Sequence, residues 1–91
     1  MLTLINNKQK EYIMASLEDN LSFINSYPEG RIEEFQKLLF ELEYNDNKCS
    51  LDFEEKALAV ESLQDFQCGR FCEFDYEYND IDNILSYLNQ N

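Results

Sequence analysis

The sequence contains no histidine, and it has only two glycines and one proline among its 91 residues. Without histidine, a common general base and a frequent zinc ligand are both missing. Two glycines are too few for the loops that hold phosphate groups, and no Gly-x-Ser-x-Gly sequence is present. The acidic residues occur where their pattern predicts contact with water, and not the burial that would separate their pKa values. We therefore predict that the protein is not an enzyme and uses no cofactor.

Cysteine is also scarce, with only Cys49, Cys68 and Cys72 present. An odd number of cysteines without histidine indicates neither a disulfide framework nor a zinc site, and the acids do not match the calcium-loop spacing. We expect no bound metal. Cys68 and Cys72 are predicted to be small buried residues, because the acids around them oppose a reactive thiolate. Cys49 lies in a polar turn and is predicted to be accessible.

Long apolar runs are missing as well. Residues 1–8 have no charged leader, and their apolar run is too short for a signal peptide. No stretch approaches the roughly 20 apolar residues that are needed to span a bilayer. We expect a cytoplasmic protein in a reducing compartment, and its size and composition suit a phage or other mobile element.

Acidic residues are plentiful: nineteen acids against seven bases give a net charge of −12. The imbalance grows along the chain, from −4 in residues 1–45 (eight acids, four bases) to −8 in residues 46–91 (eleven acids, three bases). Such a surface repels nucleic acid and anionic membranes and favours basic partners. An acidic surface that serves only solubility explains the same charge.

Hydrophobic residues make up 44% of the chain, so we expect it to fold, and 91 residues form one small acidic helical domain, 1–91. Helical spacing of apolar residues predicts a helix at about 8–26 and a second from a cap at Ser26 to about Tyr44. A third is predicted from a cap at Ser50 or Asp52 to near Gln67 or Cys68, and a fourth after a cap at Asn79 or Asp80. The predicted fold is mainly α, a compact three- to four-helix domain with one short extended segment near residues 70–78.

Each predicted helix has an apolar stripe that should face the core. The stripes are Ile13, Leu17, Leu21 and Ile24; Ile32, Phe35, Leu39 and Leu42; Phe53, Ala57, Val60, Leu63 and Phe66; and Ile81, Ile84, Leu85 and Leu88. Phe40 lies away from its stripe and is predicted to be exposed. Asp52 and Glu55 have the spacing of a capping box, and Gly69 is predicted to end the third helix in the left-handed conformation.

The extended segment is the most unusual part of the sequence. Apolar or aromatic residues alternate with acids from Cys72 to Tyr78, as in a strand with one packed and one wet face. Residues 2–5 are its predicted partner in a minimal ladder. If the segment is extended, Glu73, Asp75 and Glu77 are spaced by roughly 6.5–7 Å, which is comparable to successive phosphates of nucleic acid. Acids that merely protect a solvated edge from aggregation would have the same pattern.

We predict that this segment and the start of the next helix contact a partner. The predicted binding residues are Glu73, Phe74, Asp75, Tyr76, Glu77, Tyr78, Asp80 and Asp82. The acids would supply steering and charge mimicry, and the aromatic residues would supply contact area.

The predicted function is a non-enzymatic acidic inhibitor or adaptor that occupies a basic surface of a nucleic-acid-processing protein, as an anti-CRISPR or anti-restriction protein of the nucleic-acid-mimic type does. We expect no direct binding to nucleic acid or membrane. One alternative is an immunity protein or antitoxin that neutralises a cognate toxin. Another is a helical oligomerisation protein, for example a dimer in which Phe23 and Phe40 are buried. The sequence leaves the oligomeric state open.

Overall fold

The computed structural model describes residues 2–23, 27–69 and 76–90. Within these segments the chain forms four α-helices and a two-stranded sheet, which confirms the predicted mainly α domain. The elements are β1 (Thr3–Leu4), α1 (Asn7–Leu21), α2 (Glu29–Tyr44), β2 (Ser50–Leu51), α3 (Phe53–Gln67) and α4 (Tyr78–Gln90). No helix in these segments is long and apolar enough to cross a membrane.

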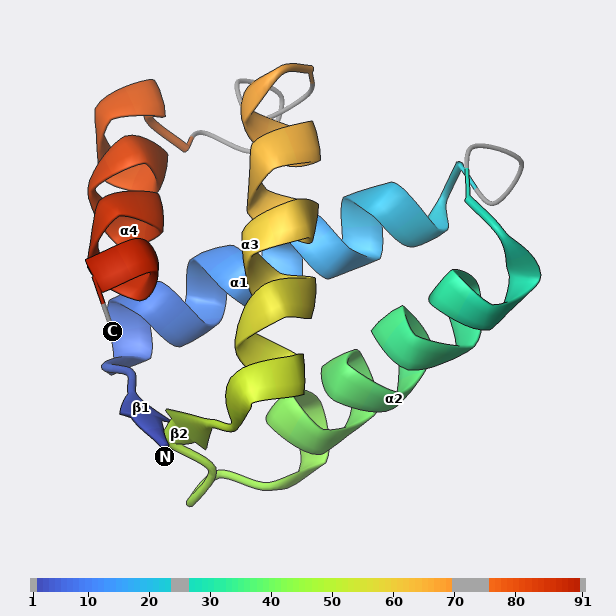
Figure 1. Cartoon of the computed structure of the whole chain (residues 1–91), viewed down its shortest axis with the longest axis horizontal. Helices are drawn as coiled ribbons and strands as arrows, with labels where there is room; N and C mark the ends of the chain where they lie inside the picture. Colours follow the sequence, from blue (N-terminus) through green and yellow to red (C-terminus); the bar gives the residue numbers. More distant parts are fainter. Residues whose placement is uncertain (1, 24–26, 70–75, 91) are drawn as a thin grey trace.

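The other elements pack around α3, which contacts α1, α2, α4 and β2. Figure 1 shows α3 and α4 side by side and running in opposite directions, while α1 crosses α3 and α2 slopes away on the other side. The hydrophobic core takes buried side chains from all four helices and from Ile5 and Leu51. This arrangement leaves α3 with a face that contacts the other helices and a face that points outward.

α1 begins where its polar side chains can cap it. The side chain of Asn6 accepts a hydrogen bond from the Gln9 N–H at 2.8 Å, and the Gln9 side chain accepts one from the Asn6 N–H at 2.8 Å. The helix ends at Leu21, five residues before the predicted end. Of its predicted stripe, two residues are buried, one is half-buried and the last lies outside the described residues: Ile13, Leu17, Leu21 and Ile24.

α2 begins at Glu29 with Pro28 as its N-cap, so the predicted cap at Ser26 is two residues too early. Ser26 itself lies outside the described residues. The correction has a simple cause: a proline disfavours the helical conformation in the residue before it, so the helix starts only after Pro28. The core residues of α2 are Phe35, Leu38 and Leu42, while Ile32 and Leu39 are half-buried. Phe40 is exposed, as predicted.

Residues 3–4 form a strand, β1, but its partner in the structure is β2 and not the predicted segment. β1 pairs antiparallel with β2, with Thr3 opposite Leu51 and Leu4 opposite Ser50. Thr3 and Leu51 are buried, so this short ladder closes one end of the core. The predicted partner of residues 2–5 was the segment 70–78, of which residues 70–75 lie outside the described residues.

α3 starts as predicted. Asp52 accepts from the Glu55 N–H at 2.8 Å, and the Glu55 side chain accepts from the Asp52 N–H at 3.0 Å. The helix ends at Gln67, also as predicted, but Gly69 does not adopt the left-handed conformation. Instead Cys68 continues in the right-handed helical region as the C-cap, with φ −77° and ψ −10°.

The buried stripe of α3 differs from the predicted one. Its buried residues are Leu58, Ala59, Ser62, Leu63 and Phe66. Phe53 and Ala57 were predicted to face the core but are exposed, and Val60 is half-buried. A buried polar contact explains the rotation: the hydroxyl groups of Ser16 and Ser62 are 2.9 Å apart, and the Asn20 side chain donates to the Ser62 carbonyl and hydroxyl at 2.9 Å. Satisfying these buried polar groups requires Ser62 to face α1.

α4 confirms its predicted stripe, since Ile81, Ile84, Leu85 and Leu88 are all buried. Its start was predicted wrongly. The helix begins at Tyr78, so Asn79 and Asp80 lie inside its first turn and do not cap it, and Tyr78 is helical, not extended. Acidic side chains in a first turn interact favourably with the helix dipole, so the start is compatible with the sequence.

Candidate protein-binding surface

The basic residues of the described chain are largely engaged by the protein itself. Lys8 forms an ion pair with Asp80 at 3.2 Å, Arg31 with Glu61 at 3.1 Å, and Lys48 with Glu55 at 3.0 Å. The Lys10 ammonium donates to the backbone carbonyl of Asn45 at 3.0 Å, and the Lys56 ammonium lies 5.9 Å from the centre of the Phe53 ring. Four of these five cations therefore connect different parts of the chain, and Lys8 and Arg31 each join two helices.

Carboxylates, in contrast, remain exposed on every helix. Examples are Glu18 on α1, Glu33 and Glu43 on α2, Glu54 on α3 and Asp82 on α4. Their number follows from the net charge of −12. The resulting anionic field extends over much of the surface and attracts cationic groups, more strongly at low salt.

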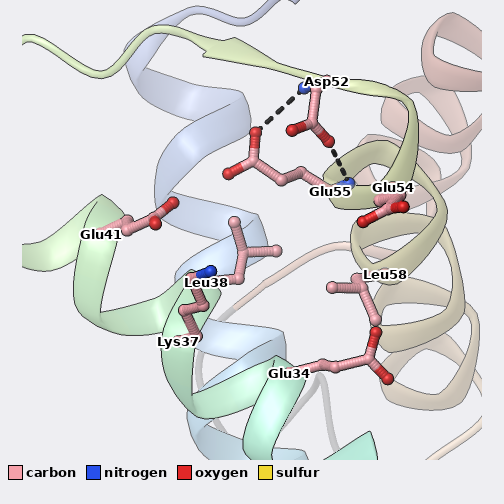
Figure 2. Close-up of a pocket in the computed structure, with 8 residues that line it drawn as sticks. All are labelled: Glu34, Lys37, Leu38, Glu41, Asp52, Glu54, Glu55 and Leu58. Atoms are coloured by element: carbon pink, nitrogen blue, oxygen red, sulfur yellow. Dashed lines mark hydrogen bonds between the residues drawn. The ribbon is translucent and has the colours of Figure 1, made fainter.

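Carboxylates also gather in a hollow between α2 and the start of α3, which we call the acidic pocket. Figure 2 shows Asp52, Glu54 and Glu55 at the start of α3 facing residues of α2. The cavity has a volume of about 180 Å³ and is lined by Glu34, Lys37, Leu38, Glu41, Asp52, Glu54, Glu55 and Leu58. It is large enough for the end of a lysine or arginine side chain.

Lys48 links two of these carboxylates. Its ammonium lies 3.0 Å from Glu55 and 3.8 Å from Glu41. A hydrogen bond with Glu55 and burial raise the pKa of Glu41. Burial also acts to raise the pKa of Glu55, but the Asp52 N–H, Lys48 and Glu41 all stabilise its charged form, and its pKa is lowered. Glu41 is therefore the carboxyl group of the pair that binds a proton first on acidification.

The predicted binding residues differ from one another in their exposure. Glu73, Phe74 and Asp75 lie outside the described residues. Glu77 and Tyr78 are exposed at the start of α4, and Asp82 is exposed on its first turns. Tyr76 is half-buried, with its ring centre 4.3 Å from that of Tyr12 and 6.0 Å from that of Phe66. Tyr76 therefore contributes part of its ring to the domain itself.

Asp80 is likewise engaged within the domain. It accepts a hydrogen bond from the Tyr12 hydroxyl at 2.8 Å and pairs with Lys8. These two contacts lower the pKa of Asp80. Burial and the hydrogen bond to Asp80 raise the pKa of Tyr12 to about 12. Asp80 therefore connects the start of α4 to α1, and the ion pair with Lys8 partly compensates its charge within the domain.

Exposed aromatic rings occur outside the predicted segment. Phe40 and Tyr44, which are 62% and 74% exposed, lie one turn apart on α2 with ring centres 4.7 Å apart. Phe53 is 75% exposed at the start of α3. The helical spacing predicted that Phe40 is exposed, but it placed Phe53 in the core. The position of Phe53 indicates its exposure. It directly follows the N-cap Asp52, and it does not share the helix face of the buried residues Leu58, Ser62 and Phe66.

The described residues include two cysteines, both exposed, and no cluster that could hold a metal ion. No group of three or more cysteine or acidic side chains among them is arranged to hold a metal ion. Cys49 is exposed, as predicted. Cys68 was predicted to be buried but is exposed, because it follows Phe66, the last core-facing residue of α3, and caps the helix end. Cys72 lies outside the described residues.

No known protein family, curated protein or solved structure matches this chain.

Proposed function

We propose that the protein is a non-enzymatic inhibitor or adaptor that binds a basic surface of another protein. The observation that carries this proposal is the unequal use of charge. Lys8, Arg31 and Lys48 form ion pairs with the protein's own carboxylates, whereas exposed carboxylates are present on all four helices. Such a surface supports recognition of a cationic partner.

The partner class that we propose is a nucleic-acid-processing protein, such as a CRISPR effector or a restriction enzyme. These proteins carry basic channels for phosphate groups, and an anionic protein surface can occupy such a channel in place of nucleic acid. The acidic pocket between α2 and α3 supports this proposal, since Glu34 and Glu54 line a cavity that fits a cationic side-chain end. Exposed aromatic rings such as Phe40 and Tyr44 would supply apolar contact area.

The predicted binding residues between Glu73 and Asp82 are still part of this proposal, but not all of them are expected to contribute equally. Glu77, Tyr78 and Asp82 are exposed and accessible to a partner, and the contribution of Glu73, Phe74 and Asp75 stays a prediction. Asp80 is expected to contribute less, because Lys8 and Tyr12 already contact its carboxylate.

The test is capture, reconstitution and competition. The immobilised protein is incubated with nuclease-treated lysate of its source or host at several salt concentrations, and each captured protein is identified, purified and titrated. We expect a partner whose affinity falls steeply with salt and from which the protein displaces duplex DNA or RNA. A partner whose affinity is independent of salt, or one that binds nucleic acid and this protein together, would contradict charge mimicry. A single cognate toxin neutralised without such competition would identify an immunity protein instead.

A further inference from the structure

A shallow groove runs along the outer face of α3, on the side away from the acidic pocket. It has a volume of about 350 Å³, and its lining includes Phe53, Lys56, Ala57, Val60 and Gln64 of α3 and Asn89 of α4. Phe53 is 75% exposed and Ala57 is exposed. We call this region the outer groove.

Helix geometry makes the outer groove a continuous stripe. Phe53, Ala57, Val60 and Gln64 are spaced by i, i+4, i+7 and i+11, so they lie on one face of α3 and extend over about three turns, or roughly 16 Å. The buried residues of α3 lie on the opposite side of the helix: Leu58, Ala59, Ser62, Leu63 and Phe66. α3 therefore has a second apolar face. The largest side chain on this face, Phe53, is exposed to solvent.

Leu4 of β1 is a further exposed apolar residue, in the strand pair that precedes α3. Leu4 is 65% exposed and pairs with Ser50, three residues before Phe53. The Tyr87 hydroxyl donates to the Leu4 carbonyl at 2.6 Å, which holds β1 against the last turns of α4, close to Asn89. Leu4 matters because Phe53, Ala57 and Val60 alone provide less surface area than the roughly 800 Å² that each partner buries in a standard interface.

Carboxylates accompany the stripe on both sides. Glu54, Glu61 and Asp65 each follow a groove residue by one position and form a parallel row on α3. Glu54 is exposed, while Glu61 also pairs with Arg31. On the α4 side, Asp82 is seven residues before Asn89 and so lies on the same face of that helix. The carboxylate row of α3 and Asp82 of α4 are complementary to basic residues that flank an apolar stripe. Lys56, whose ammonium lies 5.9 Å from the centre of the Phe53 ring, adds one cation to the groove itself.

We propose that the outer groove binds an amphipathic helix of the partner, one whose apolar face is flanked by lysine or arginine. This inference rests on the proposed function and adds the form of the partner segment and the place where it binds. Phe53 would be the central anchor, because it is the largest exposed apolar side chain of the groove. A second copy of the chain fits less well, since two molecules with a charge of −12 each would repel one another.

The probe for this proposal is a fluorescein-labelled synthetic peptide of about 18 residues, or five helical turns. It contains leucine at i, i+3, i+4 and i+7 spacing and lysine at the other positions, and a second peptide has the same composition without the amphipathic order. Fluorescence anisotropy at several salt concentrations gives the affinity. We expect the ordered peptide to bind more tightly than the disordered one, with an affinity that falls as salt rises.

Variants then locate the contact. Phe53→Ser and Ala57→Arg are expected to weaken binding of the ordered peptide by at least about tenfold, the first by removing an anchor and the second by filling the groove with a repelling cation. Phe23→Ser is the control, because Phe23 is an exposed aromatic residue that follows α1 and does not line the outer groove. Its affinity should be unchanged, and circular dichroism should show that all three variants keep their helix content.

The outcomes separate this inference from the proposed function. Binding of the ordered peptide that Phe53→Ser and Ala57→Arg leave unchanged would overturn the outer groove but not the acidic binding surface. Binding of neither peptide, even at low salt, would count against both. A dimer in analytical ultracentrifugation that Phe53→Ser dissociates would assign the groove to a second copy and overturn the inference.

Discussion

The two long faces of α3 resemble each other in sequence but not in surroundings. The inner face presents Ala59, Leu63 and Phe66 to the core, where all three are fully buried. The outer face presents Phe53 and Ala57 to solvent. Both faces contain one phenylalanine and small apolar residues at helical spacing. The apolar content of this helix is therefore greater than the fold requires, and the excess lies where a partner can reach it.

The two faces also differ in how their charges are used. Between elements of the domain, cations such as Lys48 and Lys8 are paired with carboxylates of another element. Along the outer groove, Glu54 and Asp82 are exposed. The paired charges connect elements of the domain, whereas the exposed carboxylates are the ones that the proposed function assigns to a partner.

The largest expected effect comes from exchanging the phenylalanine of each face for alanine. Phe66→Ala should cost about 3–5 kcal/mol of unfolding free energy, because it leaves a cavity in the core. Phe53→Ala should cost less than about 0.5 kcal/mol, as expected for an exposed position. Urea unfolding followed by circular dichroism measures both values. Equal losses at the two sites would mean that the outer face is packed and is not a free surface.

A smaller effect is expected from the buried polar contact that orients α3. Asn20→Ala should lower the unfolding free energy by about 1–3 kcal/mol, because it removes the hydrogen bonds from Asn20 to Ser62 in a buried setting. Asn89→Ala, at the border of the outer groove, is the control and should change stability by less than about 0.5 kcal/mol. A stable Asn20→Ala protein in the same unfolding assay would show that this contact does not set the orientation of α3.

The cap of α3 should contribute about 0.5–2 kcal/mol, because Asp52→Ala leaves a backbone N–H of the first turn without its side-chain acceptor. This loss should appear in thermal unfolding without a change in affinity for the amphipathic peptide, since Asp52 does not line the outer groove. The control is Asp46→Ala, an exposed acid in the turn before β2. A weaker peptide affinity for Asp52→Ala at full helix content would place the contact at the acidic pocket.

The smallest effect is a pH dependence at the junction of α4 with α1. The pKa of Asp80 is lowered from its ordinary value of 3.8 by the Tyr12 and Lys8 contacts. Its stabilising contribution is therefore present above pH 3.8 and is lost as the pH falls through the lower pKa of the folded protein. Asp80→Asn should flatten the decrease in stability at acid pH, and Asp82→Asn should not. Identical acid unfolding profiles for wild type and Asp80→Asn would contradict this role.

Much of the local structure was predictable from the sequence alone. The capping box of Asp52 and Glu55, the end of α3 at Gln67 and the buried stripe of α4 all depend on residues within a few positions of one another. The stripe of α4 was unambiguous because its opposite face is polar, as Asp82 and Asn83 illustrate. Net charge and the exposure of Phe40 needed no tertiary information either.

The tertiary structure decided what local spacing left open. α3 has apolar residues on two faces, and only the contact of Ser62 with Ser16 and Asn20, residues more than forty positions away, determines which face is buried. In the same way, the pairing of β1 with β2 and the engagement of Asp80 by Tyr12 connect distant parts of the chain. Periodicity reports the amphipathic character of one segment, whereas the choice between two apolar faces depends on shape and hydrogen-bond complementarity with another segment.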